Sequence, residues 1–345
     1  MKGKFNYIKR GLLILFIFSL VAIKLHAQDP NFSQFYASPL TINPALTSDG
    51  ESSWRAMTNI RTQSIGVGST YSTQSFSIDG KLKKLNDENY LGIGGVVIAE
   101  KAMDGIYKST YLNLTTSYHL SIDNNGNGLA VGLGYIYNNT RIDFAQLSFD
   151  QQLSSAGFDR ALPSGEPSLV GATSFSSACA GIMFTHTSDY SFFNVGIAGY
   201  RFAKSNRSVL DDKTQYISPR YDIHGEFGSS ISDNLNLNIS LLHMVQNGSS
   251  STTFGTSLGL VHSTDQIEED KLRMLNVGLF YRMGDALIPY IGYSYNSFQF
   301  GFSYDVNVSP VKSGSMSSNS FELSFVFRKF NAESTPKLAK YHSPI

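Results

Sequence analysis

The stretch YLNLTTSYHL, residues 111–120, decides the fold class of this chain. From Leu112 onward, leucine, threonine and tyrosine occupy every second position, and asparagine, threonine, serine and histidine lie between them. A period of two places these two sets on opposite faces of an extended strand. The stretch therefore predicts a β-strand with one largely apolar face and one uncharged polar face.

The same alternation continues from about residue 53 to residue 330, and it is equally regular in residues 234–243, 298–305 and 321–328. It predicts an even number of strands, about 14, most of them near the roughly 9–11 residues that a tilted strand needs to cross a bilayer. The predicted strands are residues 53–62, 70–79, 90–99, 111–120, 129–138, 174–186, 190–202, 216–227, 234–243, 252–262, 272–283, 287–295, 298–305 and 321–328.

We predict an all-β fold, a transmembrane antiparallel outer-membrane β-barrel. Charged residues make up 16% of the chain and aromatic residues 13%, and no stretch after residue 27 is apolar enough for a membrane helix. A soluble all-β sandwich is the alternative, because its strands show the same period of two. The polar face is rich in Asn, Ser, Thr and Gly and poor in Lys and Glu. That composition fits a barrel lumen better than a solvated surface.

The first 27 residues have the pattern of a cleaved export signal. A basic start with Lys9 and Arg10 precedes a short apolar core at residues 11–23, and residues 25–27 form a small-residue cleavage site. The core is too short for a spanning anchor, and Gln28 in place of Cys argues against a lipoprotein. We expect a signal peptide at 1–27, an irregular periplasmic segment at 28–52, the barrel at 53–330 and a periplasmic tail at 331–345.

Charge and cysteine content exclude several classes of function. Without residues 1–27 the chain has 22 basic and 27 acidic side chains, a formal charge of −5. A nucleic-acid partner would need a basic face and is not expected. The single cysteine, Cys179, rules out an internal disulfide and a cysteine-based metal site.

The motifs that suggest chemistry have simpler interpretations. GTSLG at 255–259 matches a nucleophile elbow but continues an alternating strand, with no helix after it. DNNGNG at 123–128 matches half of a calcium loop but suits a hairpin turn. The six histidines after residue 27 are scattered, without metal-ligand spacing. We expect no enzyme activity, no cofactor and no metal.

Connection lengths suggest an orientation for the barrel. Tight connections at 123–128, 187–189, 232–233 and 296–297 alternate with longer ones at 139–173, 203–215, 246–251 and 307–320. Short turns are typical of the periplasmic side, so both chain termini are expected in the periplasm. Three connections break the rule: 80–89 and 263–271 are long on the periplasmic side, and 284–286 is short outside. The charged clusters at 81–84 and 268–270 are interpreted as solvated turns, or else as a docking site for a periplasmic partner.

Residues 28–47, QDPNFSQFYASPLTINPALT, have neither strand nor helix periodicity, and Pro30, Pro39 and Pro44 interrupt any regular element. The segment closely resembles the mature N-terminus of the PorP/SprF family, membrane components of the type IX secretion system of Bacteroidetes. LSFDQQLSSAGFDRALPSGEP at 147–167 and IGYSYNSFQFGFSYDV at 291–306 also resemble this family. One departure is Ser48, where the family usually has glycine directly after NPALT.

The resemblance implies a non-enzymatic outer-membrane component that supports export, cell-surface attachment, or both, of cargo such as the large adhesins of gliding species. The implied partners are the C-terminal secretion domain of the cargo, periplasmic type IX components and outer-membrane lipid. The alternative is a porin or solute channel with no secretion role. A porin lumen should carry charged side chains that set ion selectivity, and the predicted inward positions are mostly uncharged.

Two groups of candidate site residues follow. The first is the N-terminal motif, which could fill the lumen, cap the periplasmic mouth or dock on a partner, with its three aromatic residues as anchors. Its members are Asp29, Pro30, Phe32, Ser33, Gln34, Phe35, Tyr36, Pro39, Asn43, Pro44 and Ala45. The second is the long loop 139–173, a candidate extracellular partner site because it is far longer than a hairpin needs. Its members are Phe149, Gln152, Phe158, Asp159 and Glu166.

Overall fold

The computed structural model describes residues 31–65, 69–84, 89–155, 157–166, 171–202, 216–262, 273–309 and 319–330. The expected signal peptide, Asp29, Pro30, the acidic cluster at 268–270 and the C-terminal tail lie outside these residues.

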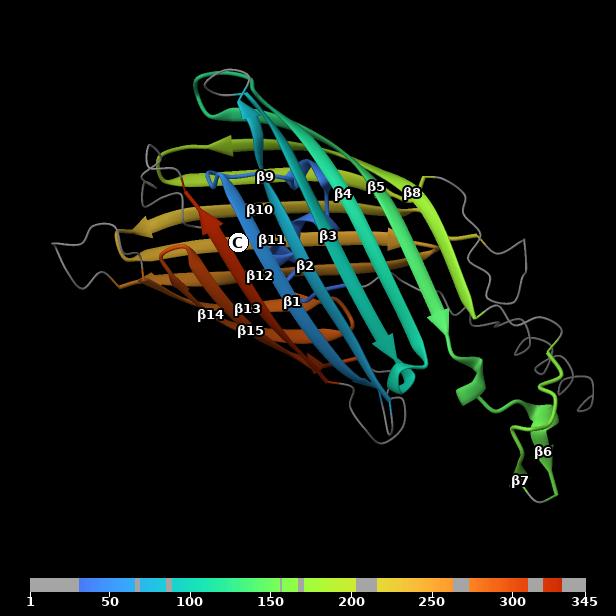
Figure 1. Cartoon of the computed structure of the whole chain (residues 1–345). Helices are drawn as coiled ribbons and strands as arrows, with labels where there is room; N and C mark the ends of the chain where they lie inside the picture. Colours follow the sequence, from blue (N-terminus) through green and yellow to red (C-terminus); the bar gives the residue numbers. More distant parts are fainter. Residues whose placement is uncertain are drawn as a thin grey trace, which may run out of the picture.

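Fourteen antiparallel strands of the described chain form one closed barrel (Figure 1). Each strand pairs with its neighbour along the chain, β5 pairs with β8, and β16 closes the barrel against β1. The barrel strands are β1 (Trp54–Ile65), β2 (Ser69–Lys84), β3 (Tyr90–Ala102), β4 (Tyr107–Ser121), β5 (Asn127–Ile142), β8 (Ala172–Thr187), β9 (Ser191–Tyr200), β10 (Arg220–Ser232), β11 (Leu235–Gln246), β12 (Ser249–Val261), β13 (Arg273–Arg282), β14 (Ala286–Tyr295), β15 (Phe298–Asn307) and β16 (Ser320–Lys329).

The predicted all-β barrel of 14 strands is confirmed, with differences at the strand ends. Strand β2 runs to Lys84 through residues predicted as a turn, with a register shift between Lys81 and Lys83. The connection predicted at 246–251 is only the tight turn Asn247-Gly248, whose two residues have φ of 50° and 78°. Positive φ is typical of two-residue hairpin turns, and the turn lets β11 and β12 pair along their whole length.

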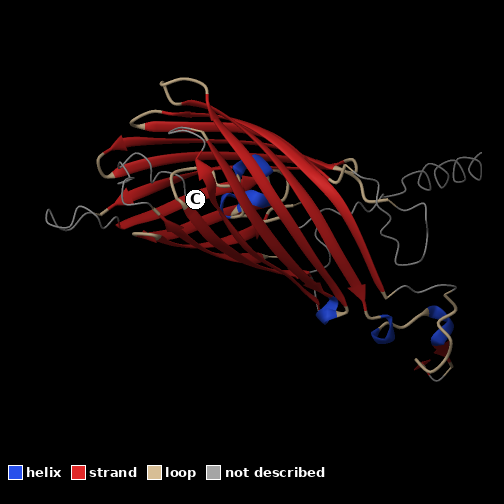
Figure 2. Ribbon diagram, turned by 45° about the horizontal axis from the view of Figure 1, so that its top comes forward, coloured by secondary structure: helices blue, strands red, loops and turns tan. Residues whose placement is uncertain are grey.

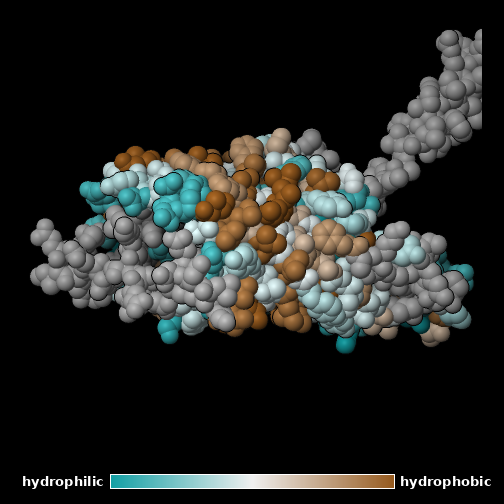
Figure 3. Space-filling view, turned by 90° about the horizontal axis from the view of Figure 1, so that it is seen from above, coloured by the Kyte–Doolittle hydropathy of each residue, from teal (hydrophilic) through white to brown (hydrophobic). Residues whose placement is uncertain are grey.

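The two faces of each strand meet different surroundings. In β4, Leu114 is 50% exposed on the outer face, whereas its neighbour Asn113 is 6% exposed on the inner face. On the surface shown in Figure 3, apolar side chains gather across the middle of the wall and hydrophilic ones toward its two ends. The polar face is thus the buried one, as expected for a barrel whose outer face contacts lipid. Among the described residues, no helix is long and apolar enough to span a membrane.

The two ends of the barrel differ in their connections. We call the end where β1 begins and β16 ends the near end, and the opposite end the far end. The near end carries compact turns such as those after β4, β8, β10 and β14. The far end carries the long connection between β5 and β8, which holds η5 (Phe144–Gln146), η6 (Asp150–Gln152), β6 (Leu153–Ser154) and β7 (Gly157–Phe158). That the near end faces the periplasm stays a prediction.

Two sequence motifs are explained by the strands around them. The Asp123 carboxylate accepts hydrogen bonds from the backbone N–H of Asn125 and Asn127 and from the Asn127 side chain, at 2.7–3.2 Å, within the turn between β4 and β5. These local bonds account for the Asp-Asn-Gly composition. The GTSLG motif lies inside β12, and Ser257 is buried on its lumen face.

Candidate functional site

Residues 31–52, here called the lumen segment, lie inside the barrel (Figure 2). The segment forms three short turns of 3₁₀ helix, η1 (Phe35–Ala37), η2 (Pro39–Thr41) and η3 (Pro44–Leu46). A proline opens η2 and η3, where its fixed φ suits a first helical residue and its missing N–H costs nothing. Pro39 also prevents η1 from growing and Pro44 prevents η2 from growing, so the segment stays compact but irregular.

The segment crosses the lumen from the far half to the near half. The Asn31 carbonyl accepts a hydrogen bond of 2.6 Å from Arg61, in the far half of β1. The Thr47 carbonyl lies 2.9 Å from Nε2 of His119, near the end of β4 at the near end. The first described residue and the last, Phe330, therefore lie toward opposite ends of the barrel. The predicted periplasmic position of both termini stays a prediction.

The start of the segment is held at the seam where the barrel closes. The buried carboxylate of Glu322 in β16 accepts hydrogen bonds from the backbone N–H of Ser33 at 2.7 Å and of Gln34 at 3.1 Å. The carboxylate also accepts a hydrogen bond of 3.0 Å from Nδ2 of Asn59 in β1. In the β1–β16 pairing, Glu322 lies opposite Arg61. One carboxylate thus joins the first strand, the last strand and the lumen segment.

A second charged group lies beside this seam. The Asp305 carboxylate of β15 is paired with Arg61 at 2.9 Å and with Arg282 at 3.1 Å. The Ser33 hydroxyl donates to Asp305 at 2.7 Å and accepts from Arg282 at 2.7 Å. All these side chains are buried, so the charges are compensated within the cluster rather than by water.

An aromatic cluster follows along the segment. The Tyr36 ring lies 5.4 Å from that of Phe280 and 5.6 Å from that of Tyr290, and the Phe35 ring lies 6.4 Å from Phe280. The last two contacts, Tyr36–Tyr290 and Phe35–Phe280, have the edge-to-face geometry that aromatic rings favour. Phe35 and Tyr36 are 5% and 2% exposed. Burial of these rings gives the polar lumen a local apolar core.

Asn43 connects the segment to the wall at mid-height. Its Oδ1 caps η3 by accepting from the Ala45 N–H at 2.8 Å, and its Nδ2 donates to the Ile182 carbonyl at 3.2 Å. Nδ2 also lies 3.0 Å from Nε2 of His224. Asn43 is fully buried, so each of these bonds replaces one that water would otherwise make.

Glycines in the wall make room for this contact. A Cβ at Gly132 would lie 2.1 Å from the backbone carbon of Pro44, and one at Gly181 would lie 2.0 Å from Oδ1 of Asn43. These two residues pair with each other across β5 and β8. The wall is therefore shaped to the segment, because any side chain at either position would collide with it.

The end of the segment is fixed at the near end. The Thr47 hydroxyl lies 2.8 Å from that of Thr115, and the Ser48 N–H donates to the Asp79 carboxylate. Asp79 forms an ion pair of 2.9 Å with Arg55. Nη2 of Arg55 in turn donates a hydrogen bond of 2.6 Å to the Leu46 carbonyl, so this ion pair holds the segment at two points.

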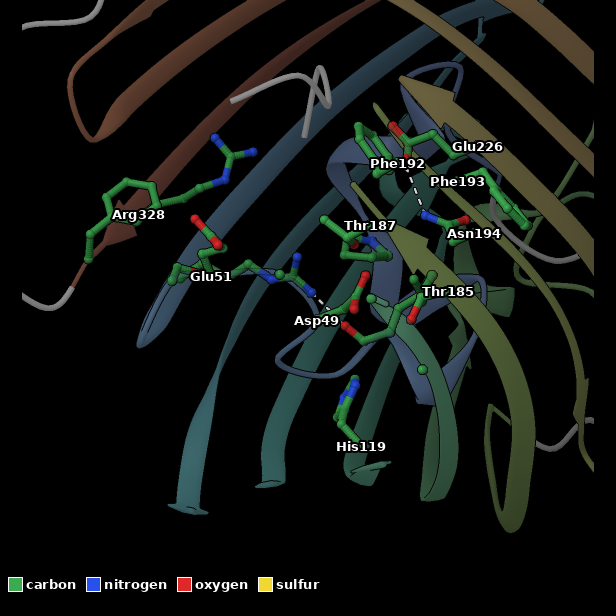
Figure 4. A pocket seen from close by; sticks show the side chains of 18 of the residues that line it. Asp49, Glu51, His119, Thr185, Thr187, Phe192, Phe193, Asn194, Glu226 and Arg328 are labelled. Atoms are coloured by element: carbon green, nitrogen blue, oxygen red, sulfur yellow. Dashed lines mark hydrogen bonds between the residues drawn. The ribbon is translucent and has the colours of Figure 1, made fainter. Parts of the chain in front are cut away.

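A cavity of about 410 Å³ lies between this end of the segment and the near-end rim (Figure 4). Pro39, Leu46 and residues 49–52 of the lumen segment contribute to its lining. Polar residues of the strand ends form much of the rest. The lining includes Asp49, Glu51, Arg55, His119, Thr185, Thr187, Phe192, Asn194, Glu226, Met274, Ser294, Gln299 and Arg328.

Comparison with known families decides the identity of the chain. Residues 24–327 match the model of the family described as type IX secretion system membrane protein PorP/SprF. The chain belongs to the PorP/SprF family. The match covers most of the sequence, including the lumen segment and all but the end of the barrel, and the protein is an outer-membrane β-barrel. None of the curated proteins matches this sequence.

Two solved structures share the fold of this PorP/SprF protein. The toluene transporter TbuX of Ralstonia pickettii has 9% identity and a TM-score of 0.52, with 86% of this chain and 94% of that chain covered. The toluene transporter TodX of Pseudomonas putida has 8% identity and a TM-score of 0.50, with coverage of 84% and 92%. At such low identity the likeness concerns the barrel fold alone.

The second predicted group of this PorP/SprF chain lies at the far end, in the long loop whose β6 and β7 stand away from the barrel rim (Figure 1). Gln152 is 6% exposed and holds the loop together. Its Nε2 donates to the Leu162 carbonyl at 2.9 Å, and its Oε1 accepts from the Phe149 N–H at 3.0 Å. Phe158 is 58% exposed, and Asp159 and Glu166 are exposed as well. Gln152 therefore has a structural position, and the partner role of this loop stays a proposal.

Sequence reasoning missed the residues that hold the lumen segment. Glu322, Asp305, Arg61, Asp79 and Arg55 are charged residues at inward positions of strands whose other inward residues are mostly uncharged. These inward charged residues could have been recognised from the sequence, because a charge buried in a lumen needs a partner. In the described residues, no group of three or more His, Cys, Asp or Glu side chains is placed to hold a metal ion.

Proposed function

We propose that this chain is a non-enzymatic component of the type IX secretion system that supports export, cell-surface attachment, or both, of cargo proteins bearing a C-terminal secretion domain. The observation that carries the proposal is the family match over residues 24–327. The partners are then the secretion domain of the cargo and periplasmic components of the system.

The occupied lumen supports this function over that of a solute channel. A barrel of 14 strands is wider than one that inward side chains alone can fill, yet narrower than the porins that keep an aqueous path. In this chain the lumen segment takes up that space, with Phe32, Leu40 and Asn43 almost fully buried. A constitutive pore would need this segment to leave. The fold shared with the toluene transporters is compatible with a channel but does not favour one.

The test is the secretome and surface proteome of a strain that lacks this chain. We expect the loss of one or more proteins with a C-terminal secretion domain from the cell surface or the medium, and their return when the intact gene is restored. The double variant Phe35→Ala, Tyr36→Ala should restore them poorly at equal barrel abundance, because the lumen segment loses its aromatic anchors. An unchanged secretome in the deletion strain would contradict the proposal.

A further inference from the structure

We infer that the near-end cavity is a binding site for an extended peptide segment with a basic side chain, supplied by a protein on the near side of the membrane. The assignment of that protein to the secretion system rests on the proposed function. The chemistry of the peptide rests only on the cavity.

The cavity opens at the near end and is closed above by the lumen segment. Pro39 and Leu46 line its inner end, and the side chains around it belong to strand ends on several sides of the barrel. Figure 4 shows the labelled side chains around the recess, with Asn194 hydrogen-bonded to Glu226. The site is thus a recess that a chain end or loop can enter from the rim but cannot cross.

The charge of the lining favours a cationic ligand. Its carboxylates are Asp49, Glu51 and Glu226, and its guanidinium groups are Arg55 and Arg328. Arg55 is already paired with Asp79 at 2.9 Å, deep in the wall. Lys81 adds a positive charge beside the lining, with its Nζ 4.4 Å from the centre of the Tyr90 ring. With Asp79 included, four carboxylates face three cationic groups, so the formal balance is acidic by one charge. A low-dielectric recess strengthens the attraction of this balance for a positive charge.

The carboxylates are not arranged for a metal ion. No group of three or more acidic, histidine or cysteine side chains in the described chain could coordinate one. The Glu226 carboxylate is instead oriented by two carboxamides. It accepts hydrogen bonds of 2.8 Å from Asn238 and 3.3 Å from Asn194. A single oriented carboxylate matches an ammonium or guanidinium group better than a cation that needs several ligands.

The neutral lining favours a peptide over a small apolar solute. Asn194, Gln299 and Thr185 carry both donors and acceptors, which match the alternating N–H and C=O groups of an extended backbone. Met274 and Phe192 offer apolar contact for one side chain. A hydrocarbon such as toluene would remove these polar groups from water without replacing their hydrogen bonds, which is costly.

A peptide in this cavity would contact the lumen segment directly. Asp49, Gly50, Glu51 and Ser52 line the cavity and continue from Ser48, whose N–H is bound to Asp79. A bound peptide would therefore touch the part of the segment that links the lumen to β1.

The test is fluorescence anisotropy with the full mature protein in detergent micelles. The probe is a labelled peptide, Gly-Ser-Thr-Lys-Val-Thr-Lys-Ser, and its comparison has both lysines replaced by glutamate. We expect saturable binding of the lysine peptide and none of the glutamate peptide. Glu226→Gln and Asp49→Asn should each weaken binding by about tenfold. Asp104→Asn, the matched acid-to-amide change at the exposed far-end turn η4 (Met103–Gly105), should leave binding unchanged.

Equal binding of the two peptides, no saturable binding, or full affinity in both cavity variants would overturn the inference. Heat-modifiable migration of each variant on a gel shows that its barrel has folded. Failure of this inference and failure of the proposed function are distinguishable, because the peptide assay needs no secretion and the secretome needs no added peptide.

Discussion

Gly132 shows how closely single residues of the wall are fitted to the lumen segment. A methyl group there would meet backbone atoms of Pro44 and Ala45 at 2.1 and 2.2 Å. Backbone cannot rotate away as a flexible side chain can, so Gly132→Ala should displace the segment. We expect a loss of about 1–3 kcal/mol in unfolding free energy and faster proteolysis within residues 31–52.

The matched control is Gly225→Ala, where the added carbon would have its nearest contact at 3.6 Å, an ordinary van der Waals distance. Its stability and proteolysis should remain close to those of the parent. Equal behaviour of the two variants in guanidinium unfolding and limited proteolysis would show that the wall is not fitted to the segment.

At the scale of elements, the sequence predicted the strands well and the lumen contacts poorly. Every predicted strand has its counterpart because alternation with period two is a local property, legible without knowledge of partners. Strand ends were predicted less accurately. Residues 81–84, three lysines and a leucine, were predicted as a turn but continue β2 past a shift in register. The side-chain partners of Ser33 and Gln34 lie 249 or more residues away in sequence, so no local pattern announces them.

The anchor between residues 33–34 and the closing seam can be weakened by changing a single side chain. In Glu322→Gln one carboxylate oxygen becomes an NH₂ group, which cannot accept the hydrogen bond from Ser33 or Gln34. The start of the lumen segment should then open more often while the barrel stays closed. A Phe32→Cys probe in a Cys179→Ala background should react with a maleimide about tenfold faster in Glu322→Gln.

Glu166→Gln in the exposed far-end loop is the control and should not change the reaction rate of the probe. Labelling of Phe32→Cys at the same rate in all three backgrounds would argue that Glu322 does not hold the segment.

At the scale of the whole molecule, the path of the lumen segment makes the two barrel ends unequal and their orientation testable. The sole native cysteine, Cys179, is 1% exposed and should therefore react slowly with a maleimide. Labelling then measures the accessibility of a single introduced cysteine. We predict that a membrane-impermeant maleimide labels Asp104→Cys, at the far end, on intact cells. Asn125→Cys, in the near-end turn after β4, should be labelled only after lysis. The reverse pattern would place the near end outside and contradict the predicted orientation.

Single-channel recording in a planar bilayer measures whether residues 31–52 close the barrel. The full mature chain should remain closed, whereas a chain lacking residues 31–47 should show large, stable conductance steps. The reason is that the inward side chains of 14 strands cannot fill the lumen by themselves. Constitutive conductance of the full chain, unchanged by the deletion, would show that residues 31–52 do not close the barrel.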